Sequence, residues 1–329
     1  MGYRIQNNTR CGVIGYGSWA TALVHTLEKN KKEIWWHIRN EEVLESMQTE
    51  GRNAKYLSDI EFNKDRVIAT SDLNEVVRNC EIILVAAPSA YLKKFLEELT
   101  EPLEGKFILS ATKGIVPDEL ITITEYFNRA YNLPYSNIGV ISGPSHAEEV
   151  ADNKLSYLTV ACKAEENAKL IGEMFATNNV KISYSEDIYG IEYAGILKNI
   201  YALASGLANG LGYGDNFRAV LAAASAKELR RFIDESYPFE RDTMDAAYLG
   251  DLLVTSYSSF SRNRRLGKLI GHGCTVKSAL NEMTMVAEGY YAAECIRRSS
   301  MRRNVDMPIA DMVWEVLYNK ASARDAMQN

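Results

Sequence analysis

The sequence predicts an α/β protein in two parts, an N-terminal doubly wound sheet and an all-α C-terminal domain. Two observations carry this prediction. Short apolar runs alternate with helical patterns as far as Tyr184, as expected when helices cover both faces of a mostly parallel sheet. From Asp187 the strand-like runs stop, and helical patterns continue toward the C-terminus. We therefore expect residues 1–188 to form a sheet domain and residues 189–329 a helical domain.

Composition and charge narrow the class of protein. The 329 residues are enough for two domains of common size. A net charge of −6 disfavours a general nucleic-acid or anionic-membrane binder, because both need a basic surface. No run approaches the roughly 20 apolar residues that span a bilayer, so we expect no membrane insertion and a cytoplasmic protein. Five cysteines without a CxxC pair and four histidines without ligand spacing predict neither a disulfide framework nor a metal site.

Apolar runs of strand length recur along the first domain. Such runs fit buried strands of a parallel sheet. A sheet of about seven or eight strands is expected from residues 11–15, 33–38, 66–71, 81–87, 106–110, 137–142, 155–162 and 181–184.

The first of these strands leads directly into a glycine motif, GYGSWA, and then into a helical pattern. Gly15 permits the tight turn, Gly17 lets the backbone approach a pyrophosphate, and Ala20 allows the helix to pack closely on the strand. Free N–H groups at the start of the helix attract phosphate charge. This motif in this setting predicts a Rossmann-like dinucleotide site.

Arg39 directly follows the second strand, about 20 residues after Gly17, where an NAD site commonly carries an acidic residue. A guanidinium there could bind the 2′-phosphate of NADP. Alternatively, Arg39 is a solvated loop residue, since Glu41 and Glu42 follow it closely. We expect NADP or NAD as cofactor, with NADP preferred.

Further candidates follow the ends of later strands, where an open parallel sheet binds its ligands. Tyr91 could cover the cofactor or pack on a helix. Lys113 stands beside a glycine just after a strand. Gly143, Ser145 and Ala147 lie in a turn that could bind an anion or a carbonyl oxygen through its backbone, although a structural turn would look similar.

In the second domain, Lys198 interrupts an apolar helical pattern over residues 190–216. Its neighbours one turn away are mostly small, namely Ala194, Gly195 and Ala202. Because an unpaired buried ammonium is costly, this lysine should reach outward, pair with a carboxylate or face a polar cleft.

Three later places in the sequence also carry polar candidates. Asp251 stands among apolar residues. The residues Ser261, Arg262 and Asn263 could bind a phosphate, because a guanidinium, a hydroxyl and an amide match its oxygens, or they could form a solvated cationic turn. Glu288 could reach a ribose or lie on a helix surface.

The chain resembles the soluble NAD(P)-dependent glycerol-3-phosphate dehydrogenases over nearly its whole length. The resemblance rests on the ordered blocks GYGSWATAL, SATKG, SGPSHAEEV, GILKN, GLGYGDN, GDLLVT and SRNRRLG. It implies a Rossmann domain with a helical C-terminal domain, usually in a homodimer. It also implies NAD(P)H-dependent reduction of dihydroxyacetone phosphate to sn-glycerol 3-phosphate for phospholipid synthesis. The alternatives are a related dehydrogenase of another small phosphorylated ketone, and a non-catalytic NAD(P)-binding regulator.

The resemblance also implies roles for single residues. Lys198 would be the catalytic acid, with Lys113 as a second lysine and Asp251 orienting Lys198. The substrate would contact these three residues together with Gly143, Ser145, Ser261, Arg262 and Asn263. The cofactor would contact Gly15, Gly17, Ser18, Trp19, Arg39, Tyr91, Lys113, Ala147, Arg262, Val286 and Glu288. The chain departs from the family at residues 220–225, where many members carry Ile-Thr-Arg-Gly.

Overall fold

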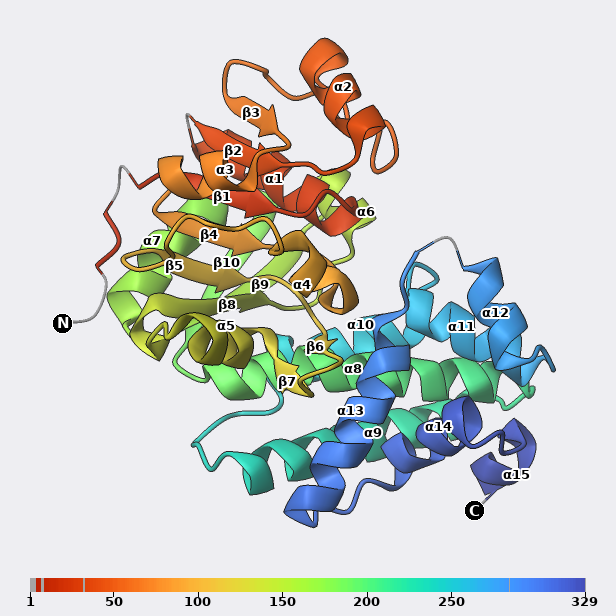
Figure 1. Ribbon diagram of the computed structural model, residues 1–329. Coiled ribbons are helices and arrows are strands. Elements are labelled where there is room, and N and C mark those ends of the chain that lie inside the picture. Colours follow the sequence, from red (N-terminus) through yellow and green to blue (C-terminus); the bar gives the residue numbers. More distant parts are fainter. Residues whose placement is uncertain (1–3, 7–8, 32, 284, 329) are drawn as a thin grey trace. The chain divides into compact units, whose positions relative to one another are not determined.

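The computed structural model describes residues 4–6, 9–31, 33–283 and 285–328 (Figure 1). The chain divides into two compact units. Unit 1 comprises Met1–Thr112 and Ile123–Ile188, and unit 2 comprises Lys113–Thr122 and Tyr189–Asn329. The segment Lys113–Thr122 therefore departs from the linear division expected at residue 188, because it packs with the helical part of the chain.

Unit 1 contains an eight-stranded sheet in the order β10-β9-β8-β5-β4-β1-β2-β3 (Figure 1). Adjacent strands are parallel, except that β8 and β9 are antiparallel. Each expected run overlaps one of these strands. They are β1 (Cys11–Ile14), β2 (Ile34–His37), β3 (Val67–Thr70), β4 (Ile82–Val85), β5 (Phe107–Ser110), β8 (Ile138–Ser142), β9 (Ser156–Cys162) and β10 (Val180–Ser185).

Helices cover both faces of this sheet, which confirms the doubly wound fold. Cys11 and Val13 of β1 belong to the core that also holds Leu23 of α1 (Ser18–Asn30). A side chain on Gly12, which faces the opposite way, would meet Val76 of α3 (Leu73–Asn79). The remaining helices of unit 1 are α2 (Glu41–Glu50), η1 (Ser89–Tyr91), α4 (Leu92–Phe95), α5 (Ile123–Tyr131), η2 (Tyr135–Asn137), α6 (Ala147–Ala151) and α7 (Glu165–Phe175).

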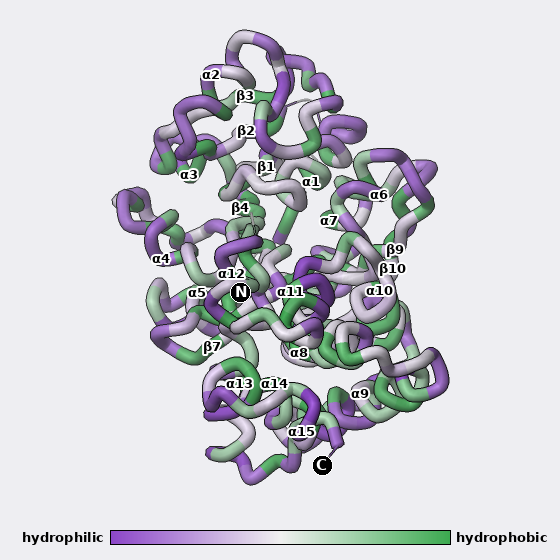
Figure 2. Tube along the Cα trace, turned by 90° about the vertical axis from the view of Figure 1, so that its right-hand side faces the viewer, coloured by the Kyte–Doolittle hydropathy of each residue, from purple (hydrophilic) through white to green (hydrophobic). Residues whose placement is uncertain are grey.

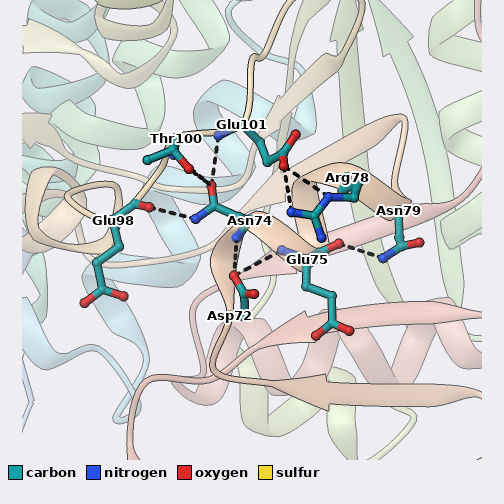
Figure 3. A network of polar contacts seen from close by, with 8 residues as sticks. All are labelled: Asp72, Asn74, Glu75, Arg78, Asn79, Glu98, Thr100 and Glu101. Atoms are coloured by element: carbon teal, nitrogen blue, oxygen red, sulfur yellow. Dashed lines mark hydrogen bonds and ion pairs between the residues drawn. The ribbon is translucent and has the colours of Figure 1, made fainter.

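An exposed polar network holds the start of α3 to the loop at residues 98–101 (Figure 3). Asp72 caps the helix by accepting from the backbone N–H groups of Asn74 and Glu75, at 2.8 and 3.2 Å. The Asn74 amide accepts from the N–H groups of Thr100 and Glu101, at 2.7 and 2.9 Å. These contacts satisfy backbone donors that neither the helix nor the loop can satisfy alone.

Unit 2 is helical apart from one short hairpin. Strands β6 (Ile115–Val116) and β7 (Ile121–Thr122) pair antiparallel within the inserted segment, and the sequence did not predict them. Among the described residues no strand follows β10, as expected. The helices are α8 (Ile188–Gly210), α9 (Asp215–Ser236), η3 (Ala246–Gly250), α10 (Asp251–Tyr257), α11 (Arg262–Gly271), α12 (Val276–Glu282), α13 (Glu288–Arg303), α14 (Pro308–Tyr318) and α15 (Ala323–Gln328).

Four glycines bring the backbones of α8 and α11 into close contact. A Cβ atom on Gly206 would lie 2.1 Å from the Arg264 carbonyl oxygen, and one on Gly210 would lie 2.4 Å from that of Lys268. Gly267 and Gly271 of α11 approach α8 in the same way. These glycines let α8 fix the position of α11, whose hydrophilic start is visible in purple in Figure 2.

Over the described part of the chain, no helix is both long and apolar enough to cross a membrane.

Candidate active site

The glycine motif of unit 1 forms the turn between β1 and α1, and its two glycines differ in what they permit. Gly15 has a φ of +112°, and a Cβ atom there would lie 2.7 Å from the Ala86 carbonyl oxygen, so the fold itself requires glycine. A Cβ atom on Gly17 would meet no atom within 4 Å. This open space beside the backbone fits the close approach of a pyrophosphate at the start of α1.

Three side chains hold this turn through its carbonyl groups. Trp36 Nε1 donates to the Gly15 oxygen at 2.6 Å, Asn53 Nδ2 to the Tyr16 oxygen at 2.9 Å, and Thr21 Oγ1 to the Gly17 oxygen at 3.0 Å. None of these three residues stood out as a site residue in the sequence. Trp36 resembles any strand residue and Asn53 lies in a loop, so neither carried a local signal.

The other predicted cofactor residues of unit 1 lie near strand ends. Ser18 is the first residue of α1, and Trp19 Nε1 donates to the Ala111 oxygen at 3.1 Å. The Arg39 guanidinium donates to the Lys94 oxygen at 2.6 Å and stacks over Phe95, 5.5 Å from its ring centre. Tyr91 is 47% exposed. Arg39 is therefore held at the edge of the protein instead of being free in solvent.

The turn after β8 has a structural reason for its glycine. Gly143 has a φ of +133°, and a Cβ atom there would lie 2.6 Å from the Tyr157 carbonyl oxygen. Ser145 Oγ donates back to the Gly143 oxygen at 3.0 Å. Ala147 begins α6.

In unit 2 the structure brings Lys113, Lys198 and Asp251 together. Asp251 is the first residue of α10 and has no exposed surface. Its Oδ2 accepts from Lys113 Nζ at 2.9 Å, and its Oδ1 accepts from Lys198 Nζ. Lys198, in the middle of α8, is only 6% exposed. Among the environments expected for Lys198, the structure shows pairing with a carboxylate, that of the buried Asp251.

The charges of this cluster shift one another's ionisation. Burial lowers the pKa of Lys198, the charge of Asp251 opposes this shift, and the nearby charge of Lys113 adds to it, so that the pKa is about 7. Burial alone would raise the pKa of Asp251, but the two ammonium groups outweigh burial and hold that pKa below its usual value. Lys198 can therefore exchange a proton near neutral pH beside a carboxylate that stays ionised.

Two asparagines connect this cluster to the rest of unit 2. Asn199 Nδ2 donates to the Lys113 carbonyl oxygen at 2.9 Å, and its Oδ1 accepts from Asn263 Nδ2 at 2.9 Å. Asn263 Oδ1 in turn accepts from the Gly289 N–H at 2.9 Å. Each contact lies at or next to a residue predicted from the sequence, but Asn199 itself was not predicted because an amide in a helix carries no distinctive pattern.

The remaining predicted residues of unit 2 lie at the starts of α11 and α13. Ser261 caps α11, its hydroxyl accepting from the Arg264 N–H at 3.2 Å. Arg262 is exposed, and its side chain has no hydrogen bond or ion pair within the described residues. Val286 precedes α13 and Glu288 begins it, both half-buried. Of the three residues expected to bind a phosphate, Arg262 has a side chain available to do so, because Ser261 and Asn263 already have partners within the protein.

Comparison with protein families covers both units. The model of the NAD-dependent glycerol-3-phosphate dehydrogenase N-terminus matches residues 10–168, and that of the C-terminus matches residues 187–328.

Similar proteins agree with these matches. The chain is 33% identical over 323 residues to the NAD(P)+ glycerol-3-phosphate dehydrogenase of Staphylococcus haemolyticus, covering 98% of this chain and 97% of that protein. It is 35% identical over 322 residues to one from Salinibacter ruber, covering 97% and 93%. The crystal structure of glycerol-3-phosphate dehydrogenase from Coxiella burnetii has a TM-score of 0.90 at 27% identity, covering 98% of each chain. The chain thus belongs to the NAD-dependent glycerol-3-phosphate dehydrogenase family.

Proposed function

We propose that this protein reduces dihydroxyacetone phosphate to sn-glycerol 3-phosphate with NADH or NADPH. The observation that carries this function is the buried Lys113–Asp251–Lys198 cluster, in a chain whose first unit contains an open glycine turn. Simple nucleotide binding gives no reason to bury two lysines on one aspartate. A reaction that places negative charge on a carbonyl oxygen gives such a reason, because the ammonium groups would stabilise that charge.

The cofactor-binding residues of unit 1 would be Gly15, Gly17, Ser18, Trp19, Arg39, Tyr91 and Ala147. Lys113, Arg262, Val286 and Glu288 would contribute from unit 2. The open space beside Gly17 and the N–H groups at the start of α1 suit a pyrophosphate. When bound, the nicotinamide cofactor supplies the hydride that reduces the ketone carbon.

Lys198 would donate the proton that neutralises the oxygen of the reduced ketone. A pKa of about 7 gives it a substantial ammonium fraction at neutral pH and makes transfer easy. The second ammonium, that of Lys113, would stabilise negative charge on the same oxygen. Asp251 would hold both Nζ atoms in place, since it accepts a hydrogen bond from each.

Arg262 would bind the substrate phosphate, because its guanidinium is exposed and makes no internal ion pair or hydrogen bond within the described residues. Binding energy from the phosphate would then position the ketone. Gly143, Ser145 and Ser261 are further substrate candidates. Asn263 would act through its neighbours, since its amide is already bonded to Asn199 and Gly289.

Three further features complete the proposal. Arg39, held beside Phe95, would favour NADP through its 2′-phosphate, with NAD as the alternative. Five free cysteines suit a reducing compartment, so we place the protein in the cytoplasm. A homodimer and a supply of glycerol phosphate for phospholipid synthesis follow from the resemblance to the family.

The test follows absorbance at the nicotinamide band with dihydroxyacetone phosphate, using NADH and NADPH in turn. Oxidation should occur, and Lys198→Ala should lower turnover by roughly two or more orders of magnitude while cofactor binding persists. Lys227→Ala, which removes an exposed lysine of α9, is the matched control and should leave turnover unchanged. No oxidation with either cofactor would favour another ketone substrate or a non-catalytic regulator. Near-normal turnover in folded Lys198→Ala would contradict the role of this lysine.

A further inference from the structure

Two arginines of unit 2 lie at the starts of two helices, and the charge of one acts on the other. Arg218 belongs to the first turn of α9, and Arg264 to the first turn of α11. Both helices contact α10. The Arg218 guanidinium stacks over Tyr257 at the end of α10, 5.5 Å from its ring centre, and the Tyr257 hydroxyl donates to the Arg218 carbonyl oxygen at 3.4 Å.

The two guanidinium groups have too few partners for their burial. Nε of Arg218 and Nε of Arg264 are both buried without a hydrogen-bond acceptor. The Arg218 side chain is only 15% exposed, and its ion pair is with Asp215, whose side chain is 93% exposed. The Arg264 side chain has no ion pair or hydrogen bond within the described residues. Buried N–H groups without acceptors are costly, so their presence on two neighbouring cations needs an explanation.

The two positive charges also act on each other. Burial lowers the pKa of Arg264, and the charge of Arg218 lowers it further. These like charges repel, and within the described residues the carboxylate that pairs with Arg218 is the exposed one of Asp215. A group with several negatively charged oxygens would relieve the repulsion and accept hydrogen bonds from both guanidinium groups.

This pair is separate from the lysine cluster. Gly206, which contacts the Arg264 backbone, lies eight residues after Lys198 on α8, or about 12 Å along the helix. Tyr257, which contacts Arg218, lies six residues after Asp251 on α10, or about 9 Å. Arg264 also follows Arg262 by two positions, which directs their side chains to different sides of α11.

We propose that Arg218 and Arg264 form a second binding site, which takes an oxyanion of the phosphate or phosphomonoester class. The bound anion bridges the starts of α9 and α11 and accepts hydrogen bonds from both guanidinium groups. Asp215 yields its bond to Arg218 when the anion binds, since its exposed carboxylate is readily hydrated. The site does not depend on the proposed reaction, because none of its residues belongs to the lysine cluster.

Calorimetric titration of the full chain with inorganic phosphate, at constant ionic strength, tests this site. The measurements are made in the Arg262→Gln variant, which lacks the guanidinium proposed to bind the substrate phosphate. Any phosphate that this variant still binds then reports on Arg218 and Arg264. In that variant, Arg264→Gln and Arg218→Gln should each weaken phosphate binding about tenfold or more, as expected for loss of a charged hydrogen bond. Arg265→Gln is the control, because its side chain is 59% exposed and pairs with Glu282.

The outcomes separate the possibilities. Phosphate binding that survives Arg262→Gln and is lost in the Arg264 and Arg218 variants supports the site. If Arg262→Gln alone abolishes phosphate binding, phosphate binds only at the proposed substrate site, and the proposal is overturned. Equal weakening by Arg265→Gln shows a general charge effect and also overturns it. Failure of the substrate assignment would appear separately, as an unchanged KM for dihydroxyacetone phosphate in Arg262→Gln.

Discussion

Two groups of polar side chains, one at the start of α3 in unit 1 and one around Asp251 in unit 2, differ mainly in their contact with water. At α3, Arg78 donates to Glu101 from a side chain that is 59% exposed (Figure 3). Around Asp251, the carboxylate and the Lys198 ammonium are almost completely buried. Both groups contain an ion pair and an asparagine that binds backbone, although the cation is a guanidinium at α3 and an ammonium at Asp251.

The difference shows what burial adds to an ion pair. Water screens the pair at α3, so the pair mainly ties a helix to a loop. Around Asp251 the low-dielectric interior lowers the pKa of Lys198 to about 7 and makes each partner depend on the others. Only the buried group can therefore exchange a proton at neutral pH, and only there should removal of one partner be severe.

The largest effect is expected from Asp251→Ala. This change leaves two neighbouring ammonium groups without their carboxylate, and loss of one partner of a buried ion pair typically costs about 3–5 kcal/mol of folding free energy. Turnover should fall roughly 100-fold or more, since Lys198 loses its orienting partner. Chemical denaturation and steady-state kinetics measure the two losses. Asp306→Ala, which removes the 79% exposed partner of Arg231, should change neither quantity measurably. Equal effects of the two variants would show that burial does not set the cost of removing one partner of an ion pair.

The pH dependence of turnover provides the next largest effect. Reduction requires protonated Lys198, so its rate should fall above about pH 7, approaching tenfold per pH unit. Lys113→Ala should move this fall to higher pH, because the charge of Lys113 lowers the pKa of Lys198. Turnover profiles at saturating substrate measure both. A rate independent of pH through this region would show that Lys198 is not the proton donor.

A smaller effect is expected from replacing matched asparagines. Asn199→Ala removes the bond to the Lys113 oxygen and leaves the Asn263 amide donor buried without its acceptor, which should cost about 1–3 kcal/mol. Asn74→Ala removes bonds to the loop at residues 98–101, but water can replace them. Denaturant titration should show the larger loss for Asn199→Ala. The reverse order would mean that burial does not determine how much each asparagine contributes to the free energy of unfolding.

The smallest effect is expected from Arg78→Ala. Its ion pair with Glu101 is screened by solvent, so the midpoint of thermal unfolding should stay within error of the unchanged protein. Differential scanning calorimetry measures this midpoint. A clear fall would show that the network in Figure 3 is coupled to the sheet more strongly than its exposure suggests.

Local pattern was sufficient for much of the fold. Each of the eight expected runs overlaps a strand, because most of these strands are buried and a buried strand must be apolar over its own few residues. The turn at Gly15 and Gly17 was also predictable, since a strand, two glycines and a helix occur in immediate succession. By contrast, β6 and β7 have only two residues each, too few to show a pattern, and their membership of unit 2 depends on contacts with helices remote in sequence.

For the candidate site, the sequence by itself determined that Lys198 is unusual, since one charge in an apolar helix is a local fact. Only the tertiary structure decided its partners. Asp251 lies 53 residues away and Lys113 is 138 residues from Asp251, and neither spacing follows from helix or strand periodicity. The same holds for Ser261, a ligand candidate from its residue type and a helix cap in the structure. Residue type limits what a side chain can bind, whereas its actual partners depend on how distant elements pack.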